Sequence, residues 1–246
     1  MTRDGALVPH APLLLPELAS DEVRGAAERV RGAMLALPFE SADVVVILSP
    51  HGTTTGVYAD VVGSLDDFGV PGIHLRRRPE RALSEALATA WGAPMLDHAV
   101  DHGIVVPLSM DRRSSAGVVA ATLAEDAEPE STAAHARSFA DALRSLAPER
   151  RLLFLASANT AAALTPRAPL TERREAGEAE QRLTAGITRD AGFAEAVALE
   201  HARLAGACGA GPLIAFGRLC RGGRAEILAH ECPVGVGYLV ARARMS

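Results

Sequence analysis

The chain has 246 residues, a formal net charge of -5, and 48% hydrophobic but only 4% aromatic residues. This length and apolar content suit one large α/β domain whose core relies on Ala, Val and Leu. The charge excludes the basic surface of a nucleic-acid-binding domain, and no stretch reaches the roughly 18 to 20 apolar residues of a membrane span. Acidic residues flank the short apolar N-terminal segment, so we expect no signal peptide. Three cysteines argue against a disulfide framework and predict a cytoplasmic protein.

Two apolar runs near the N-terminus have the features of strands that are buried on both faces. GALVPH, residues 5–10, and ADVVVILSP, residues 42–50, are short and bounded by turn residues. Between them, residues 20–37 carry apolar side chains at helical spacing, with Ser20 as the expected N-cap. Strand, helix and strand in this order predict a βαβ unit, so the carboxyl ends of both strands should lie at one edge of a parallel sheet.

The rest of the chain continues this alternation. We predict a strand within 56–65, helices over 79–92 and 131–146, and a third buried strand over 150–159. Helices over 171–190, 193–209 and 211–220 follow, and a pair of strands over 224–231 and 234–243 ends the chain. The cationic run HLRRRPER, residues 74–81, predicts a solvated loop or helix start, with anion binding as the alternative. The pattern indicates an α/β fold: a single domain over 1–246, with a mostly parallel or mixed central sheet and helices on both faces.

A histidine directly follows a proline at the end of each N-terminal strand. These are His10 in VPHAPLLLP and His51 in VVVILSPHG. Proline fixes φ and removes a donor, and neutral imidazole is a ligand for Fe, Zn, Cu and Ni. Ligands of open α/β sheets collect at the carboxyl edge, where both residues should lie. The pattern predicts a shared metal site, with two separately capped loop histidines as the alternative.

A third histidine has a distinctive context in AVDHGIVVPLSM, residues 99–110. His102 lies at a turn between Asp101, which could orient its ring, and Gly103, which would permit close approach of a ligand or a positive φ. A functional histidine and a hydrogen-bonded turn histidine both fit this context. The other histidines lack a comparable setting, so we assign no role to His74, His98, His135, His201 and His230.

These motifs together resemble a known family. VPHAPLLLPEL, LSPHG and DHGIVVPL, in this order and spacing, are similar to the class III extradiol ring-cleavage dioxygenases, specifically the subunit-B family typified by the protocatechuate 4,5-dioxygenase β-subunit. The tail, GACGAGPLIAFGRL and AEILAHECPVGVGYLVA, is also similar to this superfamily and to its Memo-type branch. The resemblance spans nearly the whole chain. It implies that His10 and His51 are ligands of a non-haem Fe(II), that His102 is a catalytic histidine in the substrate pocket, and that the substrate is a phenolic or catechol-like small molecule.

The sequence departs from the family at the third metal ligand. A carboxylate is expected before GPLIAFG, but Ala207 and Cys208 stand there. Cys208 is the one ligating side chain of this motif, and a thiolate would favour Zn or Cu over Fe(II). The alternative for Cys208 is a small buried hydrophobe. Glu231 is a less attractive ligand, because it and its neighbours His230 and Cys232 would alternate between faces of a strand.

The catalytic base of the family is also absent. In SANTAAALTP, residues 157–166, Asn159 stands in the place of the family's acid and Ala162 in that of its histidine. General base catalysis contributes typically 10²–10⁴-fold. We therefore expect a diverged dioxygenase-like oxidoreductase with weak or altered activity. The alternatives are a non-catalytic Memo-like metal-binding protein or pseudoenzyme and, third, a hydrolase using zinc-activated water. The oligomeric state stays open, a homo-oligomer among the alternatives.

Overall fold

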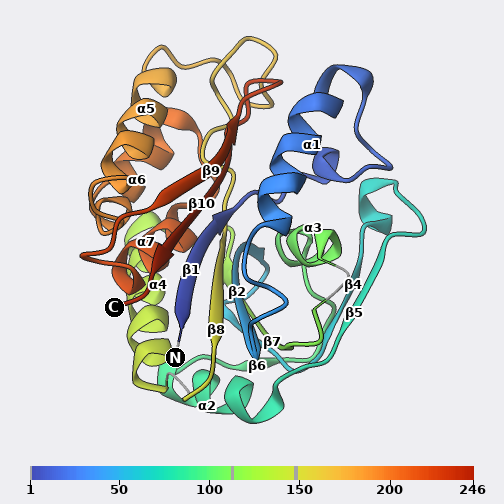
Figure 1. Ribbon diagram of the computed structural model, residues 1–246, viewed down its shortest axis with the longest axis vertical. Helices are drawn as coiled ribbons and strands as arrows, with labels where there is room; N and C mark the ends of the chain where they lie inside the picture. The colour runs from blue at the N-terminus through green and yellow to red at the C-terminus, as the bar shows by residue number, and fades with distance from the viewer. Residues whose placement is uncertain (1, 112–113, 147–148) are drawn as a thin grey trace.

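The computed structural model describes residues 2–111, 114–146 and 149–246. Eight strands form one mixed sheet in the order β6-β3-β7-β2-β8-β1-β10-β9 (Figure 1). They are β1 (Arg3–Val8), β2 (Val44–Gly52), β3 (Gly56–Tyr58), β6 (Met95–Leu96), β7 (Gly117–Ala124), β8 (Leu152–Ser157), β9 (Glu226–Glu231) and β10 (Tyr238–Arg244). A separate antiparallel pair is made by β4 (Val61–Ser64) and β5 (His74–Arg77).

Helices cover both faces of the large sheet (Figure 1). They are α1 (Asp21–Leu35), α2 (Arg81–Trp91), α3 (His102–Met110), α4 (Pro129–Leu146), α5 (Ala176–Ile187), α6 (Phe193–Ala205) and α7 (Ala210–Leu219), with short 3₁₀ turns η1 (Pro12–Leu14) and η2 (Asp66–Phe68). Helices α1 and α3 share a core with one face, and α2, α4, α6 and α7 share a core with the other. The predicted α/β fold with a mixed sheet and helices on both faces is confirmed.

The central strands are apolar along their whole length because both of their faces are buried. In β2, Val44, Val46 and Leu48 belong to one core cluster, whereas Val45 and Ile47 belong to the other. This alternation follows from the period of two in a strand, and a continuous apolar run is typical of a strand that helices cover on both sides.

Several element boundaries differ from the sequence-based predictions. The first half of residues 74–81 is strand β5 rather than a loop, and the predicted helix start is found only at the end of the run, where α2 begins at Arg81. The strand expected within 56–65 is divided between β3 and β4, which belong to different sheets. The helix expected over 171–190 is shorter, since residues 171–175 are exposed and lack the packing that stabilises helices. Ser20 occupies the N-cap of α1, but its side chain makes no capping hydrogen bond.

Three strands deliver side chains to one edge of the sheet. Strands β1 and β2 both pair in parallel with β8, which lies between them. Their carboxyl ends therefore point the same way, as the βαβ prediction requires, although the two strands are not neighbours. His10 follows the end of β1, and His51 is the second-to-last residue of β2. Among the described residues, no helix combines the length and the apolar character needed to cross a bilayer.

Candidate metal centre

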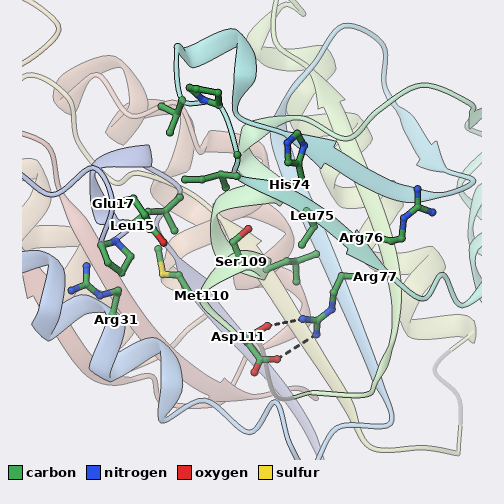
Figure 2. Close-up of a pocket in the computed structure, with 16 residues that line it drawn as sticks. Leu15, Glu17, Arg31, His74, Leu75, Arg76, Arg77, Ser109, Met110 and Asp111 are labelled. Carbon is green, nitrogen blue, oxygen red and sulfur yellow. Dashed lines mark hydrogen bonds and ion pairs between the residues drawn. The ribbon is translucent and has the colours of Figure 1, made fainter.

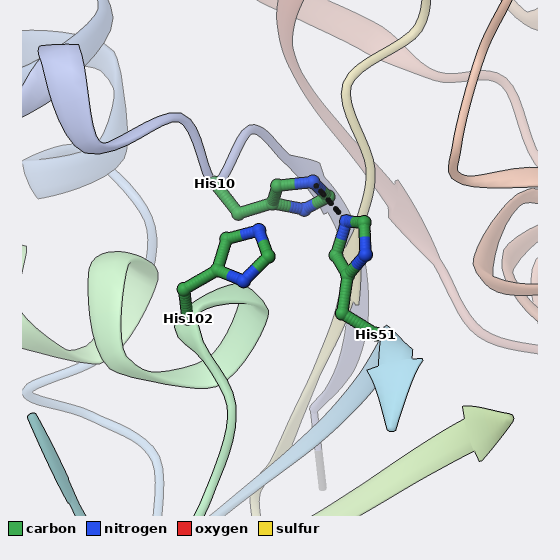
Figure 3. A group of neighbouring side chains, drawn as sticks. All are labelled: His10, His51 and His102. Carbon is green, nitrogen blue, oxygen red and sulfur yellow. Dashed lines mark hydrogen bonds between the residues drawn. The ribbon is translucent and has the colours of Figure 1, made fainter. Parts of the chain in front are cut away.

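Three histidines from separate segments meet at the carboxyl edge of the sheet (Figure 3). The Nε2 atoms of His10 and His51 are 3.1 Å apart. The His102 ring centroid lies 4.3 Å from that of His51 and 5.5 Å from that of His10. One ligand atom from each of the three residues lies within 4.8 Å of the others. The loop after β1, the end of β2 and the start of α3 therefore each contribute one imidazole to a single cluster.

Hydrogen bonds behind the ring fix which nitrogen of His10 carries the proton. His10 is only 1% exposed, and its Nδ1 lies 2.9 Å from Ser157 Oγ. The Ser157 hydroxyl donates its single proton to the carbonyl of Gly103 at 2.5 Å, because a carbonyl oxygen only accepts. His10 Nδ1 must therefore be the donor to Ser157, which leaves Nε2 with a free lone pair directed toward His51.

A carboxylate fixes the tautomer of His51 in the same way. His51 Nδ1 lies 3.1 Å from Glu125 Oε1, and Glu125 follows directly after β7. An ionised carboxylate only accepts hydrogen bonds, so the neutral ring carries its proton on Nδ1 and its lone pair on Nε2. Carboxylate, histidine and metal in a row is a recurrent arrangement of metal sites, in which the outer partner orients the ring.

The two inward nitrogens are thus both acceptors, and they face each other at 3.1 Å. Two lone pairs at this distance repel unless a proton or a metal ion lies between them. Two nitrogens that each bind one ion at about 2.1 Å, at tetrahedral or right angles, lie about 2.9 to 3.4 Å apart. The observed spacing fits a shared ion, and it is the strongest feature of the centre.

His10 and His102 are neutral in the absence of metal. Burial, helped by the charges of His51 and His102, holds the pKa of His10 well below its usual value of 6.5. Burial, with repulsion from His51, lowers the pKa of His102 to about 4. Neutral imidazole is the ligating form, so the site does not need to lose protons from these two rings at pH 7.

His102 is the first residue of α3 rather than part of a free turn. The carboxylate of Asp101 does not orient the His102 ring, since it accepts hydrogen bonds from Ser49, Thr122 and Tyr58 instead. Gly103 has no positive φ. The group that lies close to it is the side chain of Ser49 and not a ligand, since a Cβ at Gly103 would lie 2.2 Å from Ser49 Oγ. The glycine lets α3 begin directly against β2.

Cys208 lies at the edge of the same cluster. Its Sγ is 3.3 Å from His10 Nε2 and 3.9 Å from the carbonyl oxygen of Asn159. Cys208 is an exposed residue, but the atoms packed around its sulfur raise the thiol pKa to about 11. The metal-free protein therefore carries a thiol that can donate to His10. The predicted role of Cys208 as a ligand stays a prediction, and its position beside His10 is compatible with it.

The segment after β8 forms another wall of the centre. Asn159 Oδ1 accepts a hydrogen bond from the His10 amide at 3.2 Å, so this side chain holds the backbone of a candidate ligand. Ala162, in the place of the expected base, presents only a methyl group. Glu231 lies outside the centre, where it forms an ion pair with Arg29.

Sequence reasoning did not find the residues that support the centre. Ser157 and Glu125 stand at the ends of β8 and β7, and nothing in their local pattern marks them. Phe68 was missed as well: its ring centroid lies 4.7 Å from that of His102 although the residue is 50% exposed. One signal was available, since each of these residues is near the carboxyl end of a strand or in the loop that follows.

A cavity of about 710 Å³ lies apart from the histidines (Figure 2). Its walls come from the residues after η1, from α1, from β5 and the loop before it, and from the carboxyl end of α3. None of His10, His51 and His102 lines it. Arg77 is not free to bind an anion there, because its guanidinium contacts the carboxylate and carbonyl of Asp111.

No protein-family model and no curated protein matches the sequence. Among solved structures, the chain is similar to an uncharacterized protein, JW3007, from Escherichia coli K12. The two share 17% sequence identity with a TM-score of 0.63, over 97% of this chain and 98% of the other. At this identity the likeness shows the fold alone, which extends over nearly the full length of both proteins.

Proposed function

We propose that the chain binds one divalent transition metal ion through His10, His51 and His102, and that the metal-loaded protein is a diverged oxidoreductase acting on catechol-like compounds. The observation that carries the metal site is the 3.1 Å spacing of the His10 and His51 Nε2 atoms, while the Nδ1 atoms of both rings have other partners, Ser157 and Glu125. The activity rests on the resemblance of the histidine motifs to the extradiol dioxygenases. A bound ion would supply a Lewis-acidic position for the two adjacent oxygens of a diol.

The donor set favours a metal with an affinity for nitrogen. In the described part of the chain, the group that could hold an ion consists of three histidines and no carboxylate. Imidazole is a ligand for Zn, Cu, Fe and Ni, and three histidines with an open position also form catalytic zinc sites. Fe(II) remains the metal that the resemblance implies, and Zn or Cu gains from the thiol of Cys208 at 3.3 Å from His10.

The residues around the centre suit an aromatic substrate. Phe68 presents an exposed ring beside His102, with the centroids 4.7 Å apart, and so offers an apolar surface against which a second ring can pack. This contact would orient a catechol without taking part in proton transfer.

A second candidate is a metal-binding protein without catalytic activity. It is favoured by Ala162, which has no group that can accept a proton, and by the use of Asn159 to hold the His10 backbone. Under this alternative, metal binds to the same three histidines but no ring-cleavage product forms.

Metal content tests the proposal first. Protein purified without a metal-binding tag should hold about one Fe, Zn or Cu per chain by elemental analysis, and His10→Ala or His51→Ala should remove it. His135→Ala is the matched control, because this exposed ring on α4 hydrogen-bonds to Ser131, within the same helix. Unchanged metal content in both site variants would refute the metal centre.

Activity separates the two candidates. Protein loaded anaerobically with Fe(II) is exposed to oxygen with a panel of catechols, and absorbance is followed for a yellow ring-fission product. Product that is absent from the His51→Ala protein supports the enzyme. No product from any catechol, with the metal retained, supports the non-catalytic alternative.

A further inference from the structure

A second cluster of titratable side chains surrounds a buried carboxylate. Glu180, on α5, is only 3% exposed. Its Oε1 lies 2.9 Å from His230 Nε2 on β9, and its Oε2 lies 3.4 Å from His201 Nε2 on α6. The Thr160 hydroxyl also donates to Oε1. A carboxylate removed from water costs several kcal/mol unless it is paired, so its place in the interior calls for a physical role.

The hydroxyl, amide and carbonyl groups of Thr160 are all hydrogen-bonded around this carboxylate. Thr160 donates its hydroxyl to Glu180 and its amide to the Gly237 carbonyl at 3.0 Å. The Thr160 carbonyl accepts a hydrogen bond from His201 Nε2 at 2.6 Å. Thr160 is therefore fixed by α5, α6 and the start of β10 at once, and the carboxylate is one of its three anchors.

Gly237 makes room for this arrangement. A Cβ at Gly237 would lie 2.6 Å from both Glu180 Oε1 and Thr160 Oγ1, so a side chain there would expel one of them. The adjacent Ala161 pairs with Gly237 as an isolated antiparallel bridge. The segment after β8 is thus tied to β10 at the position where Glu180 enters.

Thr160 directly follows Asn159, which forms the wall of the histidine centre. Asn159 accepts a hydrogen bond from the His10 amide with its side chain, and its carbonyl oxygen lies 3.9 Å from Cys208 Sγ. A shift of Thr160 would move Asn159, and with it the backbone of His10. The two clusters are connected through two consecutive residues.

We infer that Glu180, with His201 and His230, is a positioning group for the metal centre: it fixes Thr160 and thereby holds Asn159 against His10. The inference rests on the proposed metal site for its consequence in binding, whereas the positioning itself is a property of the metal-free protein.

Ionisation keeps the carboxylate in this role. Burial opposes its charge, but the proximity of His201 and the hydrogen bonds from His230 and Thr160 outweigh burial and lower the pKa of Glu180 to about 2. Contacts with Cys232 and Glu180 raise the pKa of His230 to about 10. A charged imidazolium and a charged carboxylate therefore face each other across α5 and β9 at neutral pH. The ion pairs Arg29–Glu231 and Arg182–Glu200 carry the other charges near these residues.

Glu180→Gln tests the inference, because it removes the charge and keeps the shape. Glu195→Gln is the matched control: the Glu195 side chain is only 9% exposed, and it pairs with Arg137, Arg218 and Arg221, away from Thr160. In the metal-free proteins, amide hydrogen exchange is measured by NMR at Thr160 and His10, with Val46 in β2 reporting global opening. We expect exchange at both amides to accelerate about tenfold relative to Val46 in Glu180→Gln, and to stay unchanged in Glu195→Gln.

Cobalt binding provides the second readout. The dissociation constant for Co(II) and its visible d–d spectrum are measured for the same variants. Supporting groups behind metal ligands contribute about 10- to 100-fold to affinity, so we expect about tenfold weaker binding and an altered spectrum for Glu180→Gln only.

A second pair of variants protects the test against a folding defect. Thr160→Ser keeps the hydroxyl and should behave as the wild type, whereas Thr160→Val should reproduce the effect of Glu180→Gln. If His10 exchange relative to Val46 is unchanged in both Glu180→Gln and Thr160→Val, the inference is overturned. If the wild type binds no Co(II), the proposed function fails, and the exchange experiment still decides whether Glu180 positions His10.

Discussion

Two groups of histidines in this protein are built from similar residues and have opposite electrostatic character. In the candidate metal centre, His10 and His51 direct protonated nitrogens outward, to Ser157 and Glu125, and lone pairs inward. In the other group, His230 directs its Nε2 atom at a central carboxylate, Glu180, and His201 Nε2, which donates to the Thr160 carbonyl, lies 3.4 Å from the same carboxylate. A carboxylate behind the ring prepares the opposite nitrogen to bind a metal, whereas a carboxylate at the centre of the group produces an ion pair.

The pKa values follow this difference. Burial and repulsion from His51 outweigh the nearby carboxylates of Asp101 and Glu125 and lower the pKa of His102 to about 4. The thiol of Cys232 and the facing carboxylate of Glu180 raise the pKa of His230 to about 10. The partner of each ring nitrogen therefore decides whether a histidine can act as a ligand or as a structural cation.

Removing the carboxylate of Glu180 should have the largest effect on the free energy of unfolding. Glu180→Ala removes the hydrogen-bond acceptor of Thr160 and the anion that faces His230, whose side chain is 28% exposed. Loss of such a buried acceptor costs about 1 to 3 kcal/mol. Urea denaturation should show this loss in the free energy of unfolding. Arg81→Ala removes one partner of an exposed pair with Asp60 and should change stability by less than about 1 kcal/mol. Equal losses in the two variants would show that Glu180 carries no buried charge.

Removing the support of His10 should weaken the metal centre while leaving its ligands in place. Ser157→Ala deletes the acceptor that fixes the proton on Nδ1, so Nε2 is no longer held as the free lone pair. We expect the affinity for Co(II) or Zn(II) to fall by about 10- to 100-fold, as measured by competition with a chromophoric chelator. Ser84→Ala is the control, since this buried hydroxyl on α2 has no hydrogen-bond partner among the residues that the structure describes, and its loss should leave the affinity unchanged.

The fold was more predictable from sequence than the site. Local sequence marks the strands β2 and β8 by their apolar runs, and it marks the candidate ligands by the Pro-His pairs at the strand ends. These local signals were sufficient to place His10 and His51 at one edge of the sheet. Ser157 and Glu125 support these rings across 147 and 74 residues, and such contacts leave no periodic pattern. Glu180 illustrates the limit: it lies in a highly polar helix, where sequence gives no reason to expect a buried carboxylate.

The pH dependence of stability should distinguish the two groups in metal-free protein. For His102, with a pKa lowered from 6.5 to about 4, the unfolded state binds more protons between these values, so stability falls as the pH drops from 6.5 toward 4. For His230, with a pKa raised to about 10, stabilisation is complete below 6.5 and is lost as the pH rises toward 10. His102→Gln should flatten the acid limb of a plot of Tm against pH, and His230→Gln the alkaline limb. The reverse assignment of limbs would contradict the comparison.

The smallest expected effect on metal affinity concerns Glu125, the exposed partner of His51. The Glu125 side chain is 62% exposed, so water competes with its contact to His51 and screens its charge. Glu125→Gln should weaken metal affinity by only a few-fold, much less than Ser157→Ala. Glu130→Gln, on the first turn of α4, serves as the control for a lost surface charge. An effect of Glu125→Gln as large as that of Ser157→Ala would indicate a direct role for Glu125 at the ion.

The candidate ligands of the centre come from parts of the chain that are far apart, with His51 lying 41 positions after His10. An ion bound there would act as a cross-link that closes a long loop, and it would bind the folded chain in preference to the unfolded one. Its removal by a chelator would then loosen the attachment of α3 and of the first two strands to one another. In this way the concentration of available metal would set the lifetime of the folded protein, independently of any reaction that it catalyses.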